Sequence, residues 1–217
     1  MDKTTGMERK NRFILIGIGY FIIFHLVGFA GFHIQATEPL FRMLVPLHLM
    51  LTASVLFYFH ENWSKHFILF MVGSAVTAWL VEVAGVQTGV IFGDYHYGET
   101  LGFKIAEAPV LIGLNWLVMV YTSAILVNRF SIPFWAKPIL AATLMVLTDF
   151  FIEPVAMAHG YWSWAGDVVP VQNYLAWFAL ALLLQFWFFR IKPFPANPVA
   201  SALFIVQFFF FLGSFLF

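Results

Sequence analysis

The feature that most constrains this chain is an apolar stretch over residues 13–36 that contains no Asp, Glu, Lys or Arg. A helix needs about 20 apolar residues in a row to cross the hydrocarbon core of a bilayer, and this stretch is long enough. Its length and the lack of a small-residue cleavage site argue against a removable signal peptide. We therefore expect a transmembrane helix that stays in the protein.

Further apolar stretches follow along the chain. They lie near residues 43–59, 67–84, 109–127, 134–151, 171–189 and 198–217. The composition agrees, because 62% of the residues are hydrophobic and only 10% are charged, whereas soluble domains are about a quarter charged. The sequence predicts an all-α, polytopic membrane helix bundle of about seven transmembrane helices, built as a single integral membrane domain over residues 1–217.

The basic residues indicate how the chain is oriented, because cytoplasmic loops of membrane proteins are enriched in Lys and Arg. If the N-terminus is cytoplasmic, Arg42 and Lys104 fall outside, and the rest fall inside: Lys3, Arg9, Lys10, Arg12, Lys65, Arg129, Lys137, Arg190 and Lys192. This alternation requires an odd number of spans. It predicts a cytoplasmic tail at 1–12 and outer loops at 85–108 and 153–170 that cover a site. The expected location is the cell membrane, a bacterial inner membrane in particular.

The composition also excludes several classes of function. With 11 Lys+Arg against 11 Asp+Glu the net charge is zero, so there is no basic excess to bind a nucleic-acid backbone. The chain has no cysteine, which excludes disulfides, thiolate metal sites and a cysteine nucleophile. The seven histidines form no HxxxH or HxxHH box, the last apolar stretch has no lysine for retinal, and no diphosphate or nucleotide motif occurs. We expect neither a metal site nor a cofactor.

Two acids lie within apolar stretches, where a charge is expensive. Glu82 lies in AVTAWLVEVAG, and Asp149 lies near the end of 134–151. An acid in such a place costs about 3 kcal/mol or more unless it is paired, protonated or facing a wet cavity, so it indicates function. Asp149 and Glu153 are four residues apart and share one helix face. Two carboxylates this close in an apolar setting cannot both stay ionised cheaply, so one is expected to keep its proton.

The residue after this pair is Pro154, which we expect to stop or kink the helix. The alternative interpretation of the acidic pair is a helix end solvated at the membrane interface.

Polar and aromatic side chains are expected to meet near the outer ends of four helices. Counted along the helices, the polar side chains that reach one level are Glu82, Asn115, Asp149, Glu153 and Asn173. Residues 93–98 have the composition of a turn. Phe92, together with Tyr95 and Tyr97 of this segment, forms an aromatic patch, for which an ordinary interfacial belt is the alternative interpretation. The convergence of these residues is the main indication of a site.

In their order along the chain, these residues resemble a known family. Glu82-x2-Gly85-x3-Gly89-x2-Phe92-Gly93-x-Tyr95-x-Tyr97 is followed by Pro109 and Trp116, by Asp149-x3-Glu153-Pro154, by Gly160-x-Trp162-x-Trp164 and by Pro170-x2-Asn173-x3-Trp177. The pattern covers roughly residues 79–180 and resembles the membrane-bound carotenoid 1′,2′-hydratases of the CruF type, the group that includes bisanhydrobacterioruberin hydratase. Glu153 stands where the resemblance leads us to expect Asp, and residues 166–170 replace a more aromatic run.

The resemblance implies a cofactor-independent carbon–oxygen lyase of carotenoid biosynthesis. Such a hydratase adds water to the terminal C1′=C2′ double bond of an acyclic ψ end group, as in lycopene or γ-carotene. Its substrate is dissolved in the bilayer, and other carotenoid enzymes are candidate partners. Acid catalysis suits this reaction, and we expect Asp149 and Glu153 to supply the proton while Glu82 or Asp94 orients the water. The residues expected to bind the end group are Trp79, Phe92, Tyr95, Tyr97, Asn115, Trp116, Trp162, Trp164, Asn173 and Trp177.

Two functions of other classes stay open on the sequence. Acids within the membrane and broken helices would also suit a transporter or a proton-conducting protein, although the acids gather at one end and no inverted repeat is evident. The other is a non-catalytic assembly factor for a pigment. Product analysis in a carotenoid-producing cell separates the three.

Overall fold

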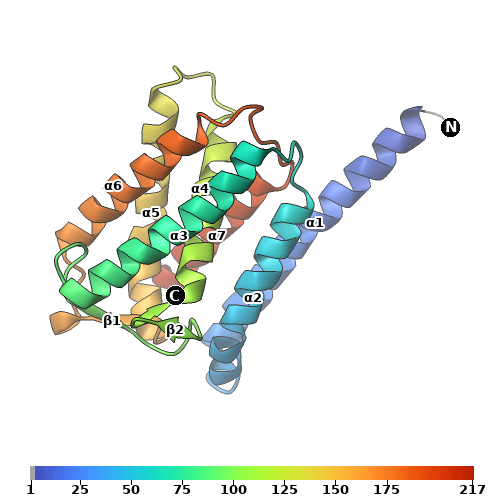
Figure 1. The fold of residues 1–217 in the computed structure, drawn as a ribbon. Helices are drawn as coiled ribbons and strands as arrows, with labels where there is room; N and C mark the ends of the chain where they lie inside the picture. The colour runs from blue at the N-terminus through green and yellow to red at the C-terminus, as the bar shows by residue number, and fades with distance from the viewer. Residues whose placement is uncertain (1–2) are drawn as a thin grey trace.

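The computed structural model describes residues 3–217, and over that range it is a bundle of seven α-helices (Figure 1). The helices are α1 (Lys3–His33), α2 (Glu38–Tyr58), α3 (Lys65–Thr88), α4 (Val110–Val127), α5 (Ala136–Ala158), α6 (Val171–Phe188) and α7 (Ala200–Leu216). Six of them are long and apolar enough to cross a membrane, and α7, with 17 residues, is a shorter apolar helix. The predicted all-α membrane bundle is confirmed.

Helix α4 forms the centre of the bundle. It contacts α2, α3, α5, α6 and α7, and 72% of its residues are buried. Because α4 is surrounded, side chains on its opposite faces reach separate regions of the interior.

Two hydroxyl groups of α4 are buried among apolar neighbours, where an unbonded hydroxyl would be destabilising. Thr122 donates a hydrogen bond to the carbonyl of Val118, and Ser123 donates one to the carbonyl of Met119.

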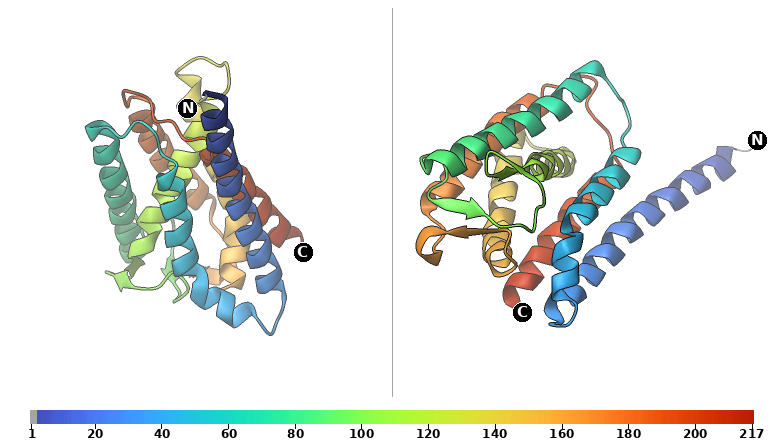
Figure 2. Two further views of the ribbon diagram at one scale, coloured as in Figure 1. Left: turned by 90° about the vertical axis from the view of Figure 1, so that its right-hand side faces the viewer. Right: turned by 60° about the horizontal axis from the view of Figure 1, so that its bottom comes forward.

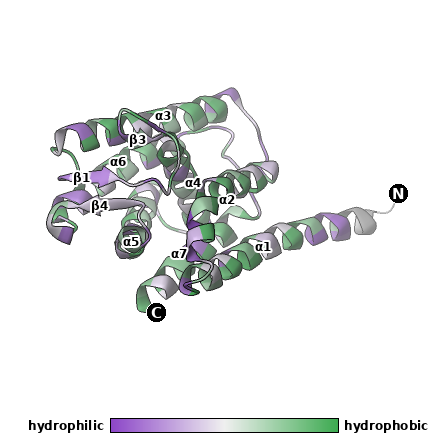
Figure 3. Cartoon of the chain, turned by 90° about the horizontal axis from the view of Figure 1, so that it is seen from below, coloured by the Kyte–Doolittle hydropathy of each residue, from purple (hydrophilic) through white to green (hydrophobic). Residues whose placement is uncertain are grey.

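Helices α1 and α2 form a layer at one side of the bundle. Helix α1 packs on α2 and α7 (Figure 2). Only 17% of the residues in its apolar part are buried. Most helical surface is coloured as hydrophobic in Figure 3, with hydrophilic stretches near the start of α1 and on the short strands. A bundle with so many exposed apolar side chains is suited to the hydrocarbon core of a membrane.

The helix connections divide between two ends of the bundle. The α2–α3, α4–α5 and α6–α7 connections lie at the top of Figure 1, together with the basic residues Arg129, Arg190 and Lys192. The short strands lie at the opposite end. That the basic end is cytoplasmic stays a prediction from the charges.

The end opposite to these basic residues carries four short strands that were not predicted. Strand β1 (Tyr95–Tyr97) pairs antiparallel with β4 (Trp162–Trp164), and β2 (Lys104–Ile105) pairs with β3 (Ala108–Pro109). A single turn of 3₁₀ helix, η1 (Ala165–Asp167), follows β4. The β1–β4 pair joins two connections that are far apart in the sequence, so it closes this end of the bundle.

Two helices continue beyond the expected boundaries. Helix α3 reaches Thr88, where Gly89 in a left-handed conformation (φ 64°) closes its last turn through a bond to the carbonyl of Gly85. Helix α5 does not stop at Pro154 but continues to Ala158. Its final turn is closed beyond the proline by main-chain bonds such as that from Tyr161 N–H to the carbonyl of Ala156. As a result, Glu82 and Glu153 both lie inside helices.

Candidate functional site

The first element of the candidate site is the carboxyl group of Glu82, which α3 points into the protein. It is buried, with 3% of its surface exposed. Its Oε2 accepts hydrogen bonds from the hydroxyls of Tyr95 and Tyr97, both at 2.7 Å, and its Oε1 accepts one from the indole Nε1 of Trp116 at 2.9 Å. Three donors thus fix the orientation of a carboxyl group that forms no salt bridge with the described residues.

The second element is the carboxyl group of Glu153, held on α5 in a matching arrangement. Its Oε2 accepts hydrogen bonds from the indoles of Trp162 at 2.7 Å and Trp164 at 2.8 Å, and its Oε1 accepts one from the amide of Asn173 at 2.9 Å. In both glutamates one oxygen therefore has two donors and the other has one. The oxygen with a single donor keeps the capacity to bind a further group.

Asp149 lies one helical turn before Glu153 and is fully buried. Its Oδ2 is 3.4 Å from the same Asn173 amide nitrogen, and its Oδ1 has no hydrogen-bond partner among residues 3–217. A buried carboxyl oxygen without a partner is costly. It is therefore a candidate position for a proton, with Asn173 bridging the two acids.

The strand pair β1–β4 supplies four of these donors through the alternation of its side chains. Tyr95 lies opposite Trp164 with rings stacked 4.9 Å apart, and Tyr97 lies opposite Trp162. The intervening residues His96 and Ser163 point outward and bond to each other at 2.8 Å. One face of this small sheet is therefore aromatic and covers both glutamates, while the other is polar.

The two phenols are held in the form that donates. Burial raises the pKa of Tyr95 and of Tyr97 well above the ordinary value, and the nearby Glu82 carboxylate raises it further. Both hydroxyls therefore keep their protons at any physiological pH. They remain donors to Glu82.

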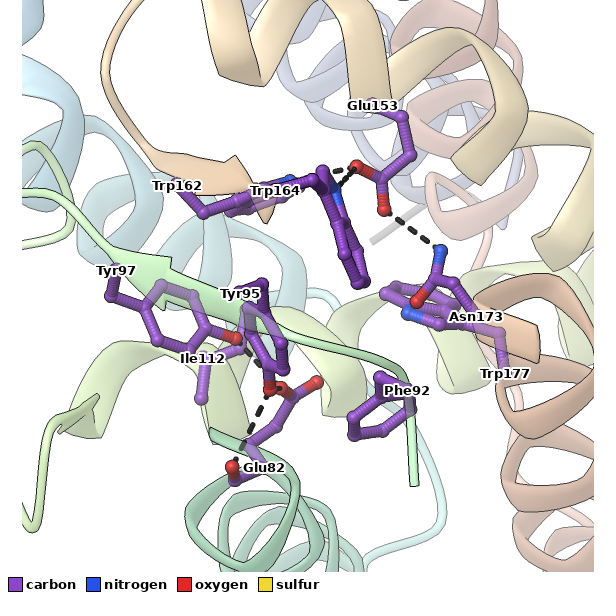
Figure 4. A pocket seen from close by; sticks show the side chains of 10 residues that line it. All are labelled: Glu82, Phe92, Tyr95, Tyr97, Ile112, Glu153, Trp162, Trp164, Asn173 and Trp177. Carbon is purple, nitrogen blue, oxygen red and sulfur yellow. Dashed lines mark hydrogen bonds between the residues drawn. The ribbon is translucent and has the colours of Figure 1, made fainter. Parts of the chain in front are cut away.

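Between the two glutamates lies a cavity of about 20 Å³. Figure 4 shows its lining, which consists of Glu82, Phe92, Tyr95, Tyr97, Ile112, Glu153, Trp162, Trp164, Asn173 and Trp177. We call this cavity, together with the residues that line it, the chamber. Its volume exceeds the roughly 15 Å³ that one water molecule requires, and its polar groups could bind that water.

Glycines allow the chamber to close tightly. A Cβ atom at Gly85 would lie 2.5 Å from the ring of Phe92 and 3.1 Å from the hydroxyl of Tyr95. Gly93 adopts a φ of 116°, and a Cβ there would lie 2.7 Å from Pro170. Gly85 and Gly93 therefore permit the close contact between residues 89–94 and their neighbours.

Nine of the fourteen predicted site residues line the chamber and five do not. Trp116 and Asp149 contact its lining residues Glu82 and Asn173, whereas Asp94, Trp79 and Asn115 lie elsewhere. Asp94 is exposed, and Trp79 lies outside the lining with its indole 3.5 Å from the carbonyl of Ala108. Asn115 was expected beside the acids of the site, but its side chain lines a second cavity instead. Its neighbour Trp116 occupies the adjacent face of α4, from which it bonds to Glu82 and stacks on Trp177 with ring centres 4.0 Å apart.

Ile112 lines the chamber and was not predicted, since an isoleucine in an apolar stretch carries no distinguishing signal. Within residues 3–217 no three His, Asp or Glu side chains gather closely enough to hold a metal ion.

Comparison with known proteins places this architecture in a family. The model of a family described as "Carotenoid biosynthesis protein" matches residues 43–216. The chain is also similar to a bisanhydrobacterioruberin hydratase of Haloarcula japonica, with 29% identity over 135 residues, which is 56% of this chain and 46% of the relative. The chain thus spans about half the length of that relative. No solved structure matches it.

Proposed function

We propose that this chain, which belongs to the carotenoid biosynthesis protein family, is a hydratase that adds water to the terminal C1′=C2′ double bond of an acyclic carotenoid. The observation that carries the proposal is the chamber, in which two buried glutamates from different helices face one water-sized cavity under an aromatic cover. The relative from Haloarcula japonica is named as a hydratase, which agrees with this type of reaction.

The reaction needs a proton donor, protection of a carbocation and a water. A proton added to C2′ of the double bond leaves a tertiary cation at C1′. The oxygen of water then bonds to C1′, and loss of one water proton to a base yields the tertiary alcohol. Two proton transfers therefore have to be made at the same end group, one to C2′ and one from the water that bonds to C1′.

The acidic pair on α5 is the proposed proton source. Asp149 and Glu153 share the amide of Asn173 and lie in an apolar interior, so the pair is more stable with one proton than fully ionised. Glu153 lines the chamber, where it would meet the end group, whereas Asp149 is not part of the lining and would act through Glu153. We therefore assign proton delivery to Glu153 and a positioning role to Asp149.

Glu82 is the proposed base that orients water. It lies in the same chamber as Glu153, and its Oε1 has only the Trp116 indole as donor, which leaves a lone pair for a water proton. Asp94, the other candidate from the sequence, is exposed. Glu82 is thus the better placed of the two acids.

The aromatic rings of the chamber suit the cationic stage. Trp164, Trp177 and Tyr95 line the space between the two glutamates, and no Lys or Arg is part of the lining. The faces of such rings attract a positive charge by about 1–2 kcal/mol each when water is excluded. The cation would therefore be stabilised between the acid and the base.

The test is product analysis in a lycopene-producing bacterial host that expresses the full chain. We expect the wild-type protein to form a carotenoid with a tertiary hydroxyl, and Glu82→Gln and Glu153→Gln to lower its formation at least about 100-fold, since general acid–base catalysis contributes that much or more. Asp149→Asn should also lower it. Asp167→Asn is the matched control, because Asp167 is exposed, and Asn tolerates its left-handed φ of 56°.

Normal product from both glutamine variants at normal protein levels would overturn the catalytic assignment. Absence of product from the wild-type chain expressed alone would favour an assembly factor or a transporter instead.

A further inference from the structure

A second cavity lies on the other side of α4, between α1, α2 and α7. Its volume is about 320 Å³, which falls at the lower end of the range for small-molecule sites. Most of its lining consists of Phe, Leu and Val side chains. It is far larger than the chamber, so it could hold the end of a long apolar molecule without any rearrangement.

The second cavity opens toward the outside of the bundle. Val27 and Leu47, on the two helices of the outer layer, line it and are 52% and 48% exposed. Both belong to apolar helices that are candidate membrane spans. A molecule dissolved in the bilayer could therefore enter sideways between α1 and α2.

Polar side chains with unused hydrogen-bonding capacity reach into this apolar space. Gln207 on α7 is more than nine-tenths buried, and its Oε1 has no hydrogen-bond partner among the described residues. The side chain of Asn115, which is half-buried, also lines the cavity and presents a second amide to it. Leaving the buried amide oxygen of Gln207 without a partner costs free energy, which a ligand with a matching donor would recover.

The polar groups of the second cavity also indicate the charge of its ligand. The lining includes His25, His48 and Thr52, which lie close together, with the two imidazole rings 5.1 Å apart. Among the described residues that line it there is no Asp, Glu, Lys or Arg. Amide and imidazole groups in an apolar pocket recognise a neutral hydroxyl, which both donates and accepts, better than they recognise an ion.

We propose that the second cavity binds the hydroxylated end group of a carotenoid, which is the product of the reaction proposed for the chamber. This inference rests on the proposed function for its choice of alcohol. Neighbouring residues connect the two sites: Trp116 bonds to Glu82 whereas Asn115 lines the second cavity, and Trp162 covers the chamber whereas Tyr161 lines the second cavity. The tertiary hydroxyl is held by the amides of Asn115 and Gln207, and the chain extends into the bilayer.

The test measures binding and not turnover. The full-length Glu82→Gln protein, solubilised in detergent, is incubated with lycopene or with 1-hydroxylated lycopene and purified again, and the pigment retained per protein is read from its absorbance. We expect the hydroxylated carotenoid to be retained about tenfold better than lycopene, which is the gain from one or two hydrogen bonds. Asn115→Leu and Gln207→Leu should each remove about three- to tenfold of that preference.

A matched pair of substitutions on α1 tests the cavity itself. Gly28 lines the second cavity, and a Cβ there would meet only the ring of Phe210 at 3.7 Å, so Gly28→Leu fills the cavity without a backbone clash. Gly19→Leu is the control, because a Cβ at Gly19 would meet nothing within 4 Å and Gly19 does not line the cavity. We expect Gly28→Leu to retain at least about tenfold less hydroxylated carotenoid and Gly19→Leu to retain as much as the parent.

Two results would overturn the inference: equal retention of both carotenoids by the parent, or full retention by Gly28→Leu. Because retention is measured without turnover, failure of this inference is distinguishable from failure of the proposed function, which product analysis reports separately.

Discussion

Glu82 and Glu153 are held by the same hydrogen-bond pattern although their donors differ. Two donors meet at one oxygen and a single donor at the other, from Tyr95, Tyr97 and Trp116 at Glu82 and from two indoles and an amide at Glu153. Indole and amide groups do not give up a proton, and the two phenols, although weak acids, keep theirs because burial raises their pKa. The donors therefore fix each carboxyl group in place without themselves supplying the transferred proton.

The first residue-level prediction concerns Tyr97→Phe, which removes one of the three donors to Glu82 while keeping the ring. We expect product formation to fall about tenfold, because a hydrogen bond to a charged group is worth about 1.5–3 kcal/mol and part of that loss is compensated by the remaining donors. The measurement is product per folded protein in the lycopene-producing host.

Tyr121→Phe is the matched control for this variant. The Tyr121 hydroxyl is equally buried and bonds to His60 Nδ1 at 2.7 Å, but Tyr121 is not part of the chamber. Equal loss of product per folded protein in the two variants would show that the effect is common to buried tyrosine hydroxyls and not specific to the Glu82 contact.

The second residue-level prediction concerns His60, in the connection between α2 and α3. Burial lowers its pKa to about 4, and its ring stacks on Phe67 with centres 3.9 Å apart. The unfolded chain, with an ordinary His pKa near 6.5, binds a proton that the folded chain excludes between about pH 6.5 and 4. The stability from neutral His60 is therefore complete above pH 6.5 and is lost as the pH falls toward 4.

We expect the thermal unfolding midpoint of the detergent-solubilised protein to drop between pH 7.5 and pH 5, and His60→Gln to reduce that drop. His66→Gln, which removes an exposed histidine close to His60 in the sequence, is the control. An unchanged pH dependence in His60→Gln would contradict the prediction.

At the scale of the elements, apolar stretches were sufficient to predict the helices. An aromatic patch and covering loops were expected, but the strand pairing that joins them was not predicted. Uncharged runs of about 20 residues have few alternatives to a membrane helix. The Tyr95-His96-Tyr97 and Trp162-Ser163-Trp164 segments each have the period-two alternation of a strand, but three residues are too few to identify one. Their pairing is a contact across more than sixty residues, which no local pattern specifies.

The site shows the same division between local and long-range information. The four-residue spacing of Asp149 and Glu153 is local, and it correctly placed both side chains on one face of α5. Asn115 was misplaced because the level of a residue along a helix says nothing about the direction in which its side chain points. A helix that is buried all round, such as α4, has no polar face from which that direction could be inferred.

A prediction at this scale concerns the contact between α3 and α4. A Cβ at Gly113 would lie 2.5 Å from the carbonyl oxygen of Ala75, which is backbone and cannot move aside cheaply. We expect Gly113→Ala to destabilise the protein by about 1–3 kcal/mol, the usual range for overpacking. The measurement is resistance to unfolding by SDS in mixed micelles.

Gly28→Ala is the control for Gly113→Ala, because the added methyl group meets only a ring atom at 3.7 Å. It should leave stability unchanged or raise it by a few tenths of a kcal/mol, as alanine favours a helix over glycine. Equal stability of the two variants would mean that α3 and α4 separate more easily than their packing indicates.

At the scale of the whole molecule, the chamber is closed in a way that determines how it could open. Its cavity of about 20 Å³ has space for a water molecule but not for a carotenoid end group. Strand β1 is attached to α3 through the bonds from Tyr95 and Tyr97 to Glu82, whereas β4 is attached to α5 through the bonds from the two tryptophans to Glu153. Separation of the two strands would therefore break a short ladder while leaving both glutamates with their donors.

A reversible crosslink between the strands tests this opening. His96 and Ser163 are partners in the antiparallel register and point away from the chamber, and Cα atoms of such partners lie about 4.5–5.5 Å apart, within the range of a disulfide. The chain has no cysteine of its own, so the double variant His96→Cys/Ser163→Cys forms no competing intramolecular bridge. We expect the oxidised double variant to lose most of its product formation in the assay of the proposed reaction and to regain it with reductant, while each single cysteine variant is unaffected by oxidant. Full activity of the oxidised form would mean that the substrate reaches the glutamates from the side of the helices, with the aromatic cover in place throughout the reaction.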